Sequence, residues 1–394
     1  MLNLQRMKSK LPIKSNILIW ARRSRGLSIE DVARRLKKPS DLIVAWEDGG
    51  QTPTFSELEH LAYDIYKRPL AVFFLSDIPK ETDLKSEFRT LPENEISTFS
   101  QKLIKYIREA KDKQYSLQEL FPHGNPSKRL LLESKLSSNK NPEDAADLLR
   151  KFLNITLSLQ RSFKKPEDTY KYFRNLIGEN GIYVFQYPID LTETRGFCVY
   201  DKEFPVIVVS SKDSAYGKVF TVFHEIGHLL FQVSGISLDK GLLYRNETSK
   251  TIEIFCNKFA ADILVPKQIL LEHALVKGRK SGIWDREELM AISADFNVSQ
   301  EVILRRLLDL GLAMPQEYEE FRKRMKEEIS KRVRPKKGPP YAVKVISQLG
   351  HNYTLVVLNN LRKNVINEFQ ASDYLGVKMN NISQIESALL SHYG

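Results

Sequence analysis

Hydrophobic residues in the second half of the chain follow two different spacings. Three short runs of β-branched and aromatic residues, bounded by Pro, Asp and Gly, predict β-strands at 182–187, 196–200 and 205–210. Further along, apolar residues recur every three to four positions, which is typical of amphipathic helices. We expect these helices at 218–232, 251–264, 267–276, 286–295 and 300–310. The pattern predicts an α+β fold that is mostly helical and contains a small β-sheet.

The N-terminal part of the chain predicts a bundle of short helices. Ser28 is a suitable N-cap for a helix with acidic residues in its first turn. A second helix at about 40–47 is followed by Gly49, which favours its end. A third begins after Thr54 and carries apolar residues at helical spacing, namely Leu58, Leu61, Ala62 and Ile65. Short helices separated by tight turns predict a helix-turn-helix bundle over residues 15–75.

We therefore expect five segments along the chain. The first two are a helix-turn-helix domain and a charged helical connecting region, at residues 1–80 and 81–165. The α+β domain follows at 166–320. A basic linker rich in Pro and Gly and a small C-terminal module that matches no motif complete the chain, at residues 321–340 and 341–394.

Basic residues are concentrated in two places. The chain has 60 Lys and Arg against 49 Asp and Glu, a net charge of +11. Residues 1–40 hold 11 basic and 2 acidic side chains, and residues 322–337 hold 9 and 2. Such segments favour anionic partners, and nucleic acid is the first candidate among them. Solvated basic ends that bind nothing specific have the same composition.

Other features of the composition indicate the compartment. The two cysteines, Cys198 and Cys256, form no CxxC pattern, which excludes a disulfide scaffold and favours a reducing environment. The N-terminus lacks the apolar core of a secretory signal, and no apolar run reaches the length of about 18 residues that a membrane span needs. We expect a cytoplasmic protein with no membrane partner.

The most specific chemical signal is an HExxH motif at residues 224–228. On a helix, His224 and His228 lie one turn apart on the same face, so both imidazoles can bind one Zn²⁺. Glu225 between them can take a proton from metal-bound water. Two histidines on a helix surface with other partners are the alternative interpretation.

A catalytic zinc usually has three protein ligands and one open position. Glu253, on the next predicted helix, is the best candidate for the third ligand, with a solvent-facing Glu as the alternative. Asn257 lies one turn further on the same face, where it could bond to a ligand histidine. Cys256 is a possible extra ligand, but a thiolate would crowd a three-ligand hydrolytic site, so a buried core cysteine is favoured. His273 and Tyr216 could stabilise an oxyanion, but the sequence does not place them.

The two segments FTVFHEIGHLLF and EIFCNKFAADILVP resemble the ImmA/IrrE family of zinc metallopeptidases. The resemblance covers about residues 170–315 and implies a zincin-like domain with a small sheet and an HExxH helix. Glu253 has the family's offset from Asn257, which supports a site of His224, His228 and Glu253. Cys256 departs from the pattern, since it stands where Ala is usual. The resemblance also implies a protein substrate, typically a transcriptional repressor or an antitoxin-like partner.

Residues 15–75 resemble the Cro/repressor-type (XRE) helix-turn-helix. The segments GLSIEDVARRL, AWEDGG and TPTFSELEHLA carry this resemblance. The positions that would face bases are Ser40, Asp41, Leu42, Val44 and Ala45. None of them is Arg, Lys, Asn or Gln, the side chains that read purine edges best. Non-specific contact with phosphates is one alternative, through Arg22, Arg23, Arg25, Arg34, Arg35, Lys37 and Lys38. Docking of a protein on the helix at 40–47 is the other.

Together these features predict a zinc-dependent endopeptidase that cleaves a specific regulatory protein. His224, His228 and Glu253 would hold the metal, and Glu225 would act as general base. One alternative is a DNA-binding transcriptional regulator whose zinc site is structural or sensory. Another is an antitoxin-like interaction protein that uses an apolar helix face. Proteolysis is favoured because a structural zinc prefers four protein ligands and has no need of Glu225.

Overall fold

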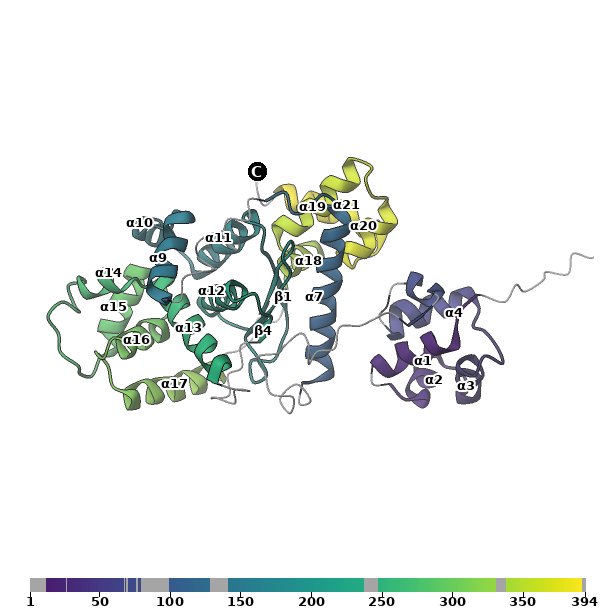
Figure 1. The fold of residues 1–394 in the computed structure, drawn as a ribbon, viewed down its shortest axis with the longest axis horizontal. Helices are drawn as coiled ribbons and strands as arrows, with labels where there is room; N and C mark the ends of the chain where they lie inside the picture. Colours follow the sequence, from purple (N-terminus) through teal and green to yellow (C-terminus); the bar gives the residue numbers. More distant parts are fainter. Residues whose placement is uncertain are drawn as a thin grey trace, which may run out of the picture. The chain divides into compact units, whose positions relative to one another are not determined.

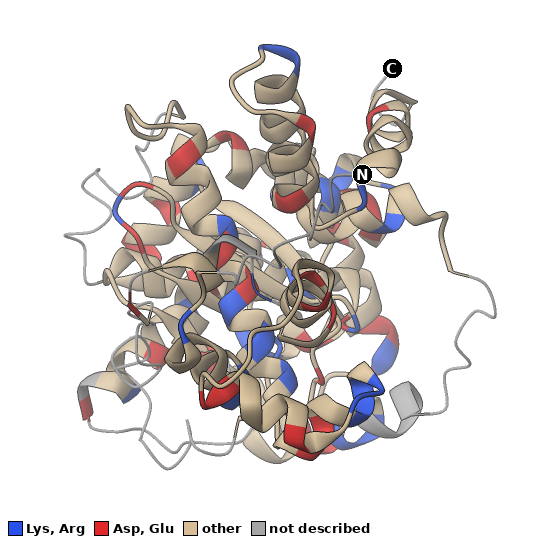
Figure 2. Cartoon of the chain, turned by 90° about the vertical axis from the view of Figure 1, so that its right-hand side faces the viewer, with Lys and Arg blue, Asp and Glu red and all other residues tan. Residues whose placement is uncertain are grey.

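The computed structural model describes residues 12–25, 27–66, 70–75, 99–127, 141–236, 247–330 and 338–391, together with residues 68, 77 and 78. The chain contains two compact units, Met1–Asp83 and Leu84–Gly394. Acidic and basic residues are interspersed along the described helices (Figure 2). Among these helices, none combines the length and the apolar character that crossing a bilayer requires.

The first unit is a bundle of short helices, as its sequence predicts. They are α1 (Ser15–Ser24), α2 (Ile29–Leu36), α3 (Ser40–Glu47), α4 (Phe55–Glu59), a π-helix η1 (His60–Tyr66) and a 3₁₀-helix η2 (Leu70–Phe74). Ser28 caps α2 in a capping box with Asp31, and Lys37 ends that helix in the left-handed conformation. Their apolar faces meet around the buried indole of Trp46. The identity of this bundle as an XRE-type domain stays a prediction.

The second unit is built around a mixed four-stranded sheet with the strand order β1-β3-β2-β4. The strands are β1 (Tyr183–Tyr187), β2 (Gly196–Val199), β3 (Val206–Ser210) and β4 (Gly235–Ile236). β1 is parallel to β3, whereas β2 is antiparallel to both β3 and β4. The three predicted strands are present, and the two-residue strand β4 was not predicted. The α+β class is confirmed in this general form.

One face of the sheet is covered by α12 (Ala215–Leu230), which packs on β2 and β3. Behind α12 lies α13 (Glu247–Leu264), and α11 (Pro166–Glu179) and α9 (Pro142–Phe152) flank the pair (Figure 1). The remaining helices of this side are α10 (Leu157–Ser162), α14 (Lys267–Leu271), α15 (Arg286–Phe296), α16 (Gln300–Asp309) and α17 (Pro315–Ser330). A buried ion pair between Asp262 and Arg306 joins α13 to α16. These contacts fix where α13 presents its side chains to α12.

The opposite face is covered by helices that lie far apart in the sequence. These are α7 (Gln101–Leu120) and, from the C-terminal segment, α18 (Tyr341–Leu349), α19 (His351–Arg362), α20 (Glu368–Leu375), a 3₁₀ turn η3 (Met379–Asn381) and α21 (Ile382–Ser391) (Figure 1). Aromatic residues of the strands, including Phe185 and Phe197, share one core with these helices. The C-terminal segment therefore supplies one cover of the sheet, which the sequence did not predict.

The five-segment division remains a prediction in its finer boundaries. The described C-terminal helices belong to the same compact unit as the sheet. The predicted basic linker at 321–340 begins within α17, and its residues 331–337 lie outside the described part of the chain.

Candidate metal centre

Helix α12 carries the HExxH motif in the interior of the second unit. Its N-terminus is capped by Ser214, whose Oγ accepts the backbone N–H of Gly217 at 3.0 Å. Apolar residues surround the motif, and His224, Glu225 and His228 are themselves buried, with exposed fractions of 5%, 0% and 0%. Burial of three ionisable groups is costly unless they pair or bind a metal. The motif therefore needs partners from other elements.

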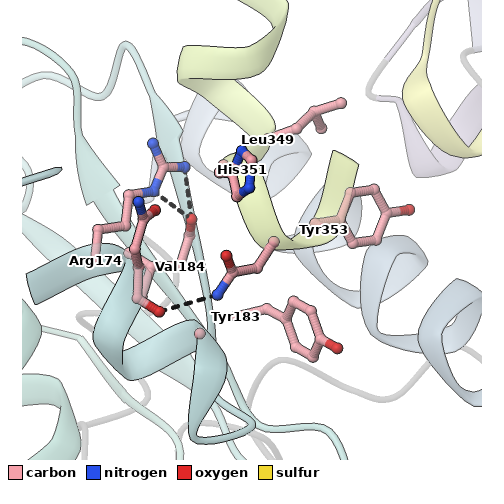
Figure 3. Close-up of a pocket in the computed structure, with 10 residues that line it drawn as sticks. Arg174, Tyr183, Val184, Leu349, His351 and Tyr353 are labelled. Atoms are coloured by element: carbon pink, nitrogen blue, oxygen red, sulfur yellow. Dashed lines mark hydrogen bonds between the residues drawn. The ribbon is translucent and has the colours of Figure 1, made fainter. Parts of the chain in front are cut away.

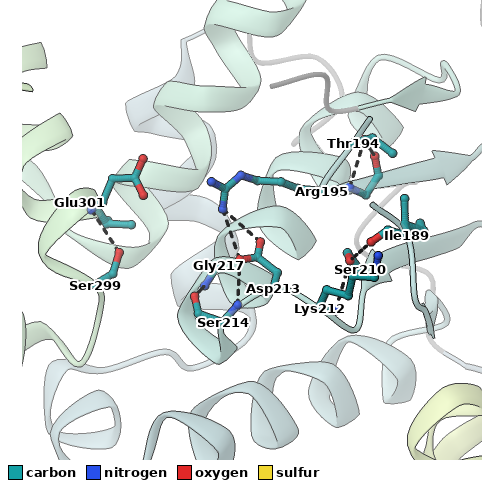
Figure 4. Close-up of polar contacts among 12 residues, drawn as sticks. Ile189, Thr194, Arg195, Ser210, Lys212, Asp213, Ser214, Gly217, Ser299 and Glu301 are labelled. Carbon is teal, nitrogen blue, oxygen red and sulfur yellow. Dashed lines mark hydrogen bonds and ion pairs between the residues drawn. The ribbon is translucent and has the colours of Figure 1, made fainter. Parts of the chain in front are cut away.

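Polar contacts attach the start of α12 to the sheet (Figure 4). Arg195, just before β2, pairs with Asp213 at 3.1 Å, and an oxygen of Asp213 accepts the N–H of Ser214 at 2.7 Å. Ser210, at the end of β3, donates its hydroxyl to the carbonyl of Ile189 at 2.8 Å. These contacts set the position at which α12 leaves the sheet, and with it the position of the motif two turns later.

Helix α13 brings Glu253 to the two imidazoles. The Nε2 atoms of His224 and His228 lie 3.2 Å apart. Glu253 Oε2 lies 3.3 Å from His224 Nε2, and Glu253 Oε1 lies 3.1 Å from His228 Nε2. Zinc bound tetrahedrally at about 2.0–2.1 Å keeps its ligand atoms about 3.3–3.4 Å apart. The three side chains that the sequence brings forward as metal ligands thus converge at about this spacing, with one carboxylate oxygen of Glu253 beside each imidazole.

The charges of this cluster also suit a cation. Burial alone would raise the pKa of Glu253, but the imidazoles of His228 and His224 outweigh it, so the pKa of this carboxyl lies well below its ordinary value. Burial alone would lower the pKa of His228, whereas Cys256 and Glu253 raise it, and its pKa lies well above the ordinary value. The carboxylate is therefore ionised, as a metal ligand must be, whereas an ion that binds here has to displace the proton of His228, because only a neutral imidazole coordinates a metal.

Glycines allow the close approach of three elements at this cluster. A Cβ at Gly227, inside the motif, would lie 2.8 Å from the Sγ and 3.0 Å from the Cα of Cys256. A Cβ at Gly235, on β4, would lie 2.5 Å from Cγ of the His228 ring. These distances are shorter than ordinary contacts of a Cβ atom, so a side chain at either position would force its neighbours to move. Sequence reasoning missed both residues, although a Gly inside HExxH on a buried helix signals close packing.

Cys198 lies on the sheet side of the motif, and Cys256 on the α13 side. The Sγ of Cys198 accepts the backbone N–H of Gly235 at 3.3 Å. Burial raises the pKa of the Cys198 thiol well above its usual range, and the carboxylate of Glu225 adds to this effect. Ligand atoms of His224, His228 and Cys256 all lie within 4.8 Å of one another. The structure thus buries Cys256, as expected of a core cysteine, and also places it beside the candidate ligands.

The remaining candidate residues of the second unit make contacts outside the cluster of His224, His228 and Glu253. Asn257 is half-buried on α13, and among the described residues no hydrogen bond joins it to His224 or His228. Tyr216 donates its hydroxyl to Asn297 Oδ1 at 2.6 Å, and His273 Nε2 lies 2.9 Å from Asp295 Oδ2. The role of Asn257 beside a ligand histidine stays a prediction.

The basic residues singled out in the first unit differ in their surroundings. Arg22 is mostly buried, and its guanidinium makes two 2.7 Å bonds to the carboxylate of Glu47, so it serves the packing of the bundle. Arg34 pairs with Asp31 at 3.0 Å, and Lys38 pairs with Glu57 at 3.0 Å, both at the surface. The exposed members of the set are Arg23, Arg34, Arg35, Lys37 and Lys38. Nucleic-acid contact through this set stays a prediction.

A small polar pocket lies elsewhere in the second unit, between α11, β1 and the turn from α18 to α19 (Figure 3). Arg174 donates to the carbonyls of Ser347 at 2.6 Å and Gln348 at 3.1 Å, and Asn352 donates to the carbonyl of Asn175 at 3.0 Å. The side chains that line the pocket therefore join the C-terminal helices to the rest of the unit. None of the residues of the candidate metal centre lines it.

The comparison with protein families agrees with the geometry. Residues 177–308 match the family model described as the IrrE N-terminal-like domain, Peptidase_M78. The match spans β1 to α16 and contains both histidines, Glu225 and Glu253. A comparison with curated proteins found no match. The matched domain suggests a metallopeptidase of the ImmA/IrrE type, and the cluster of potential ligands inside it suggests a bound metal.

Proposed function

We propose that the chain is a zinc-dependent endopeptidase that cleaves a specific regulatory protein. The observation that carries this proposal is the convergence of His224, His228 and Glu253, whose ligand atoms lie 3.1 to 3.3 Å apart. Two imidazoles and one carboxylate are a common donor set of catalytic zinc. A zinc ion held there supplies Lewis acidity, since it lowers the pKa of a coordinated water towards about 7 and polarises a carbonyl.

Glu225 is the candidate general base. It follows His224 directly on α12, so it lies at the edge of the face that carries the ligands. In a peptidase, Glu225 takes the proton of the attacking water and passes it to the nitrogen of the leaving amine. Its complete burial keeps bulk water away from that transfer.

The substrate class is also a proposal. The family resemblance of the catalytic domain favours a transcriptional repressor or an antitoxin-like protein. The first unit would then bring the enzyme to its substrate, or to the DNA on which the substrate sits. Its exposed basic residues on and after α2, Arg34, Arg35 and Lys37, support the second route.

Metal analysis and cleavage assays on the full chain test the proposal together. We expect about one zinc per chain, retained by Glu225→Gln and lost by His224→Ala. The regulators and antitoxin-like proteins encoded beside the gene would serve as substrates, with products identified by mass spectrometry. Glu225→Gln should cut about 10²–10⁴-fold more slowly than the parent. Normal metal content together with a parental cleavage rate in Glu225→Gln would refute the role of this residue.

A DNA-binding regulator with a sensory or structural metal is the second candidate, and the exposed basic residues of the first unit favour it. Gel shifts over a range of salt concentrations separate the two functions. A regulator should bind DNA with sequence selectivity, and Glu225→Gln should leave this binding unchanged. Arg34→Gln with Arg35→Gln should weaken DNA binding and reduce its dependence on salt. A chain that binds no DNA and still cleaves its substrate would exclude the regulator.

A further inference from the structure

Cys256 lies beside the candidate metal centre, and a site of three ligands gives it no role. It lies three residues after Glu253 on α13, so the two side chains share a face of that helix. It is fully buried. Its Sγ packs over Gly227, where the missing side chain allows the two helices to come within contact of each other.

Cys256 lies close to the other potential metal ligands, which an ordinary core cysteine need not do. Ligand atoms of His224, His228 and Cys256 lie within 4.8 Å of one another, and Glu253 lies 3.1 and 3.3 Å from the same two imidazoles. The two imidazoles are therefore neighbours of both Cys256 and Glu253, so an ion held by His224 and His228 has both of these side chains close to it. Zinc binds thiolate, imidazole and carboxylate alike, and four protein donors close its tetrahedron.

We infer that the Cys256 thiolate is the fourth ligand of the resting metal centre and occupies the place that the reacting water needs. This inference rests on the proposed metal site and assigns a regulation to it, because an enzyme in this state is latent. When Sγ binds the metal, the thiol proton passes to solvent. When water takes the place of Sγ, the sulfur is protonated again, so no oxidant or reductant is required.

The second cysteine shows what a cysteine outside the ligand set looks like. Cys198 is equally buried, but its Sγ accepts the N–H of Gly235 and faces the carbonyl of Val233 at 3.7 Å. It is not among the residues whose ligand atoms cluster with the histidines. Cys198→Ala is therefore a matched control for Cys256→Ala, since both remove one buried sulfur beside the same helix.

Cobalt substitution provides the test, because a thiolate bound to Co²⁺ produces a sulfur-to-metal charge-transfer band in the near ultraviolet. The full chain is stripped of metal, loaded with one Co²⁺, and its spectrum recorded. We expect the band in the parent and in Cys198→Ala, and its complete loss in Cys256→Ala and Cys256→Ser. Zinc affinity should fall more than about tenfold in both Cys256 variants, because even groups outside the ligand set typically contribute 10–100-fold. At saturating zinc, the Cys256 variants should cleave substrate faster than the parent.

The outcomes separate this inference from the proposed function. One Co²⁺ per chain with no charge-transfer band, or a band that persists in both Cys256 variants, overturns the role of Cys256 and leaves the three-ligand site intact. A parent chain that binds neither metal overturns the metal site itself, and the inference with it. Circular dichroism of Cys256→Ser, which differs from the parent by one atom, identifies any loss that comes from misfolding.

Discussion

The two faces of the central sheet have opposite chemical characters. On the α12 side, the strands contribute aliphatic side chains and one cysteine, and the helices behind them bury ionisable groups at 3.1 to 3.3 Å from one another. On the α7 side, the strands contribute large aromatic residues, and buried polar groups bond to nearby backbone. Gln114, for example, donates to the carbonyls of Val199 and Phe204 at 3.2 and 2.9 Å.

This difference indicates that one face of the sheet mainly stabilises the unit, whereas the other face carries the candidate metal centre. The aromatic face gains stability from buried area and satisfied hydrogen bonds. The α12 side gathers charged groups that are costly to bury unless they pair with one another or a cation joins them. If the separation holds, changes on the aromatic face will alter stability without altering metal binding, and changes between α12 and α13 will alter both.

The largest effect is expected at Phe185 on the aromatic face. Its ring is fully buried and meets Tyr353 edge to face, with ring centroids 5.2 Å apart. Phe185→Ala should lower the free energy of unfolding by about 3–5 kcal/mol, because it removes buried area and leaves a cavity. Denaturant titration measures the loss, and Phe369→Ala, at a residue that is 57% exposed, should change stability by less than about 0.5 kcal/mol. Loss of zinc from folded Phe185→Ala would show that the two faces are coupled.

A smaller effect, on both properties, is expected at Gly227. The added methyl group of Gly227→Ala would meet Cys256 at 2.8 Å from Sγ and 3.0 Å from Cα, so α12 and α13 must separate. Overpacking of this kind costs about 1–3 kcal/mol, and the displaced helices should hold zinc more weakly. The control is Gly282→Ala, whose Cβ would meet nothing nearer than 3.9 Å. Unchanged melting and zinc affinity in Gly227→Ala would mean that the helices can move apart without cost.

The smallest effect is expected at the hydroxyl of Tyr353. This hydroxyl lies 3.0 Å from Ser116 Oγ and donates to the carbonyl of Tyr374 at 3.1 Å. Tyr353→Phe should lower the free energy of unfolding by about 1 kcal/mol, the usual net value of a hydrogen bond, with metal content unchanged. Tyr341→Phe changes the same atom at a residue that is 46% exposed and should have no measurable effect. Equal values for the two variants would mean that the buried hydroxyl contributes nothing to the aromatic face.

The sequence brought together the side chains that converge between α12 and α13, but it did not predict what covers the aromatic face of the sheet. His224 and His228 are related by helical spacing alone, and Glu253 is the best candidate on the next predicted helix, a choice that the family resemblance supports, so local pattern was sufficient to select these three. The approach of Cys256 to Gly227 depends on how two helices pack, which no single-helix pattern contains. The cover that α18 and α19 provide for β1 joins segments more than 150 residues apart, and their apolar faces do not specify a partner.

Every potential ligand of the centre comes from one of two helices, and this has a thermodynamic consequence. If the proposed ion binds between α12 and α13, it acts as a crosslink that only the native state possesses. The free energy of unfolding should therefore rise by about 1.4 kcal/mol for each tenfold increase of free zinc above the dissociation constant, and the melting temperature should rise with it. The amount of intact protein in a cell would then follow the supply of this metal.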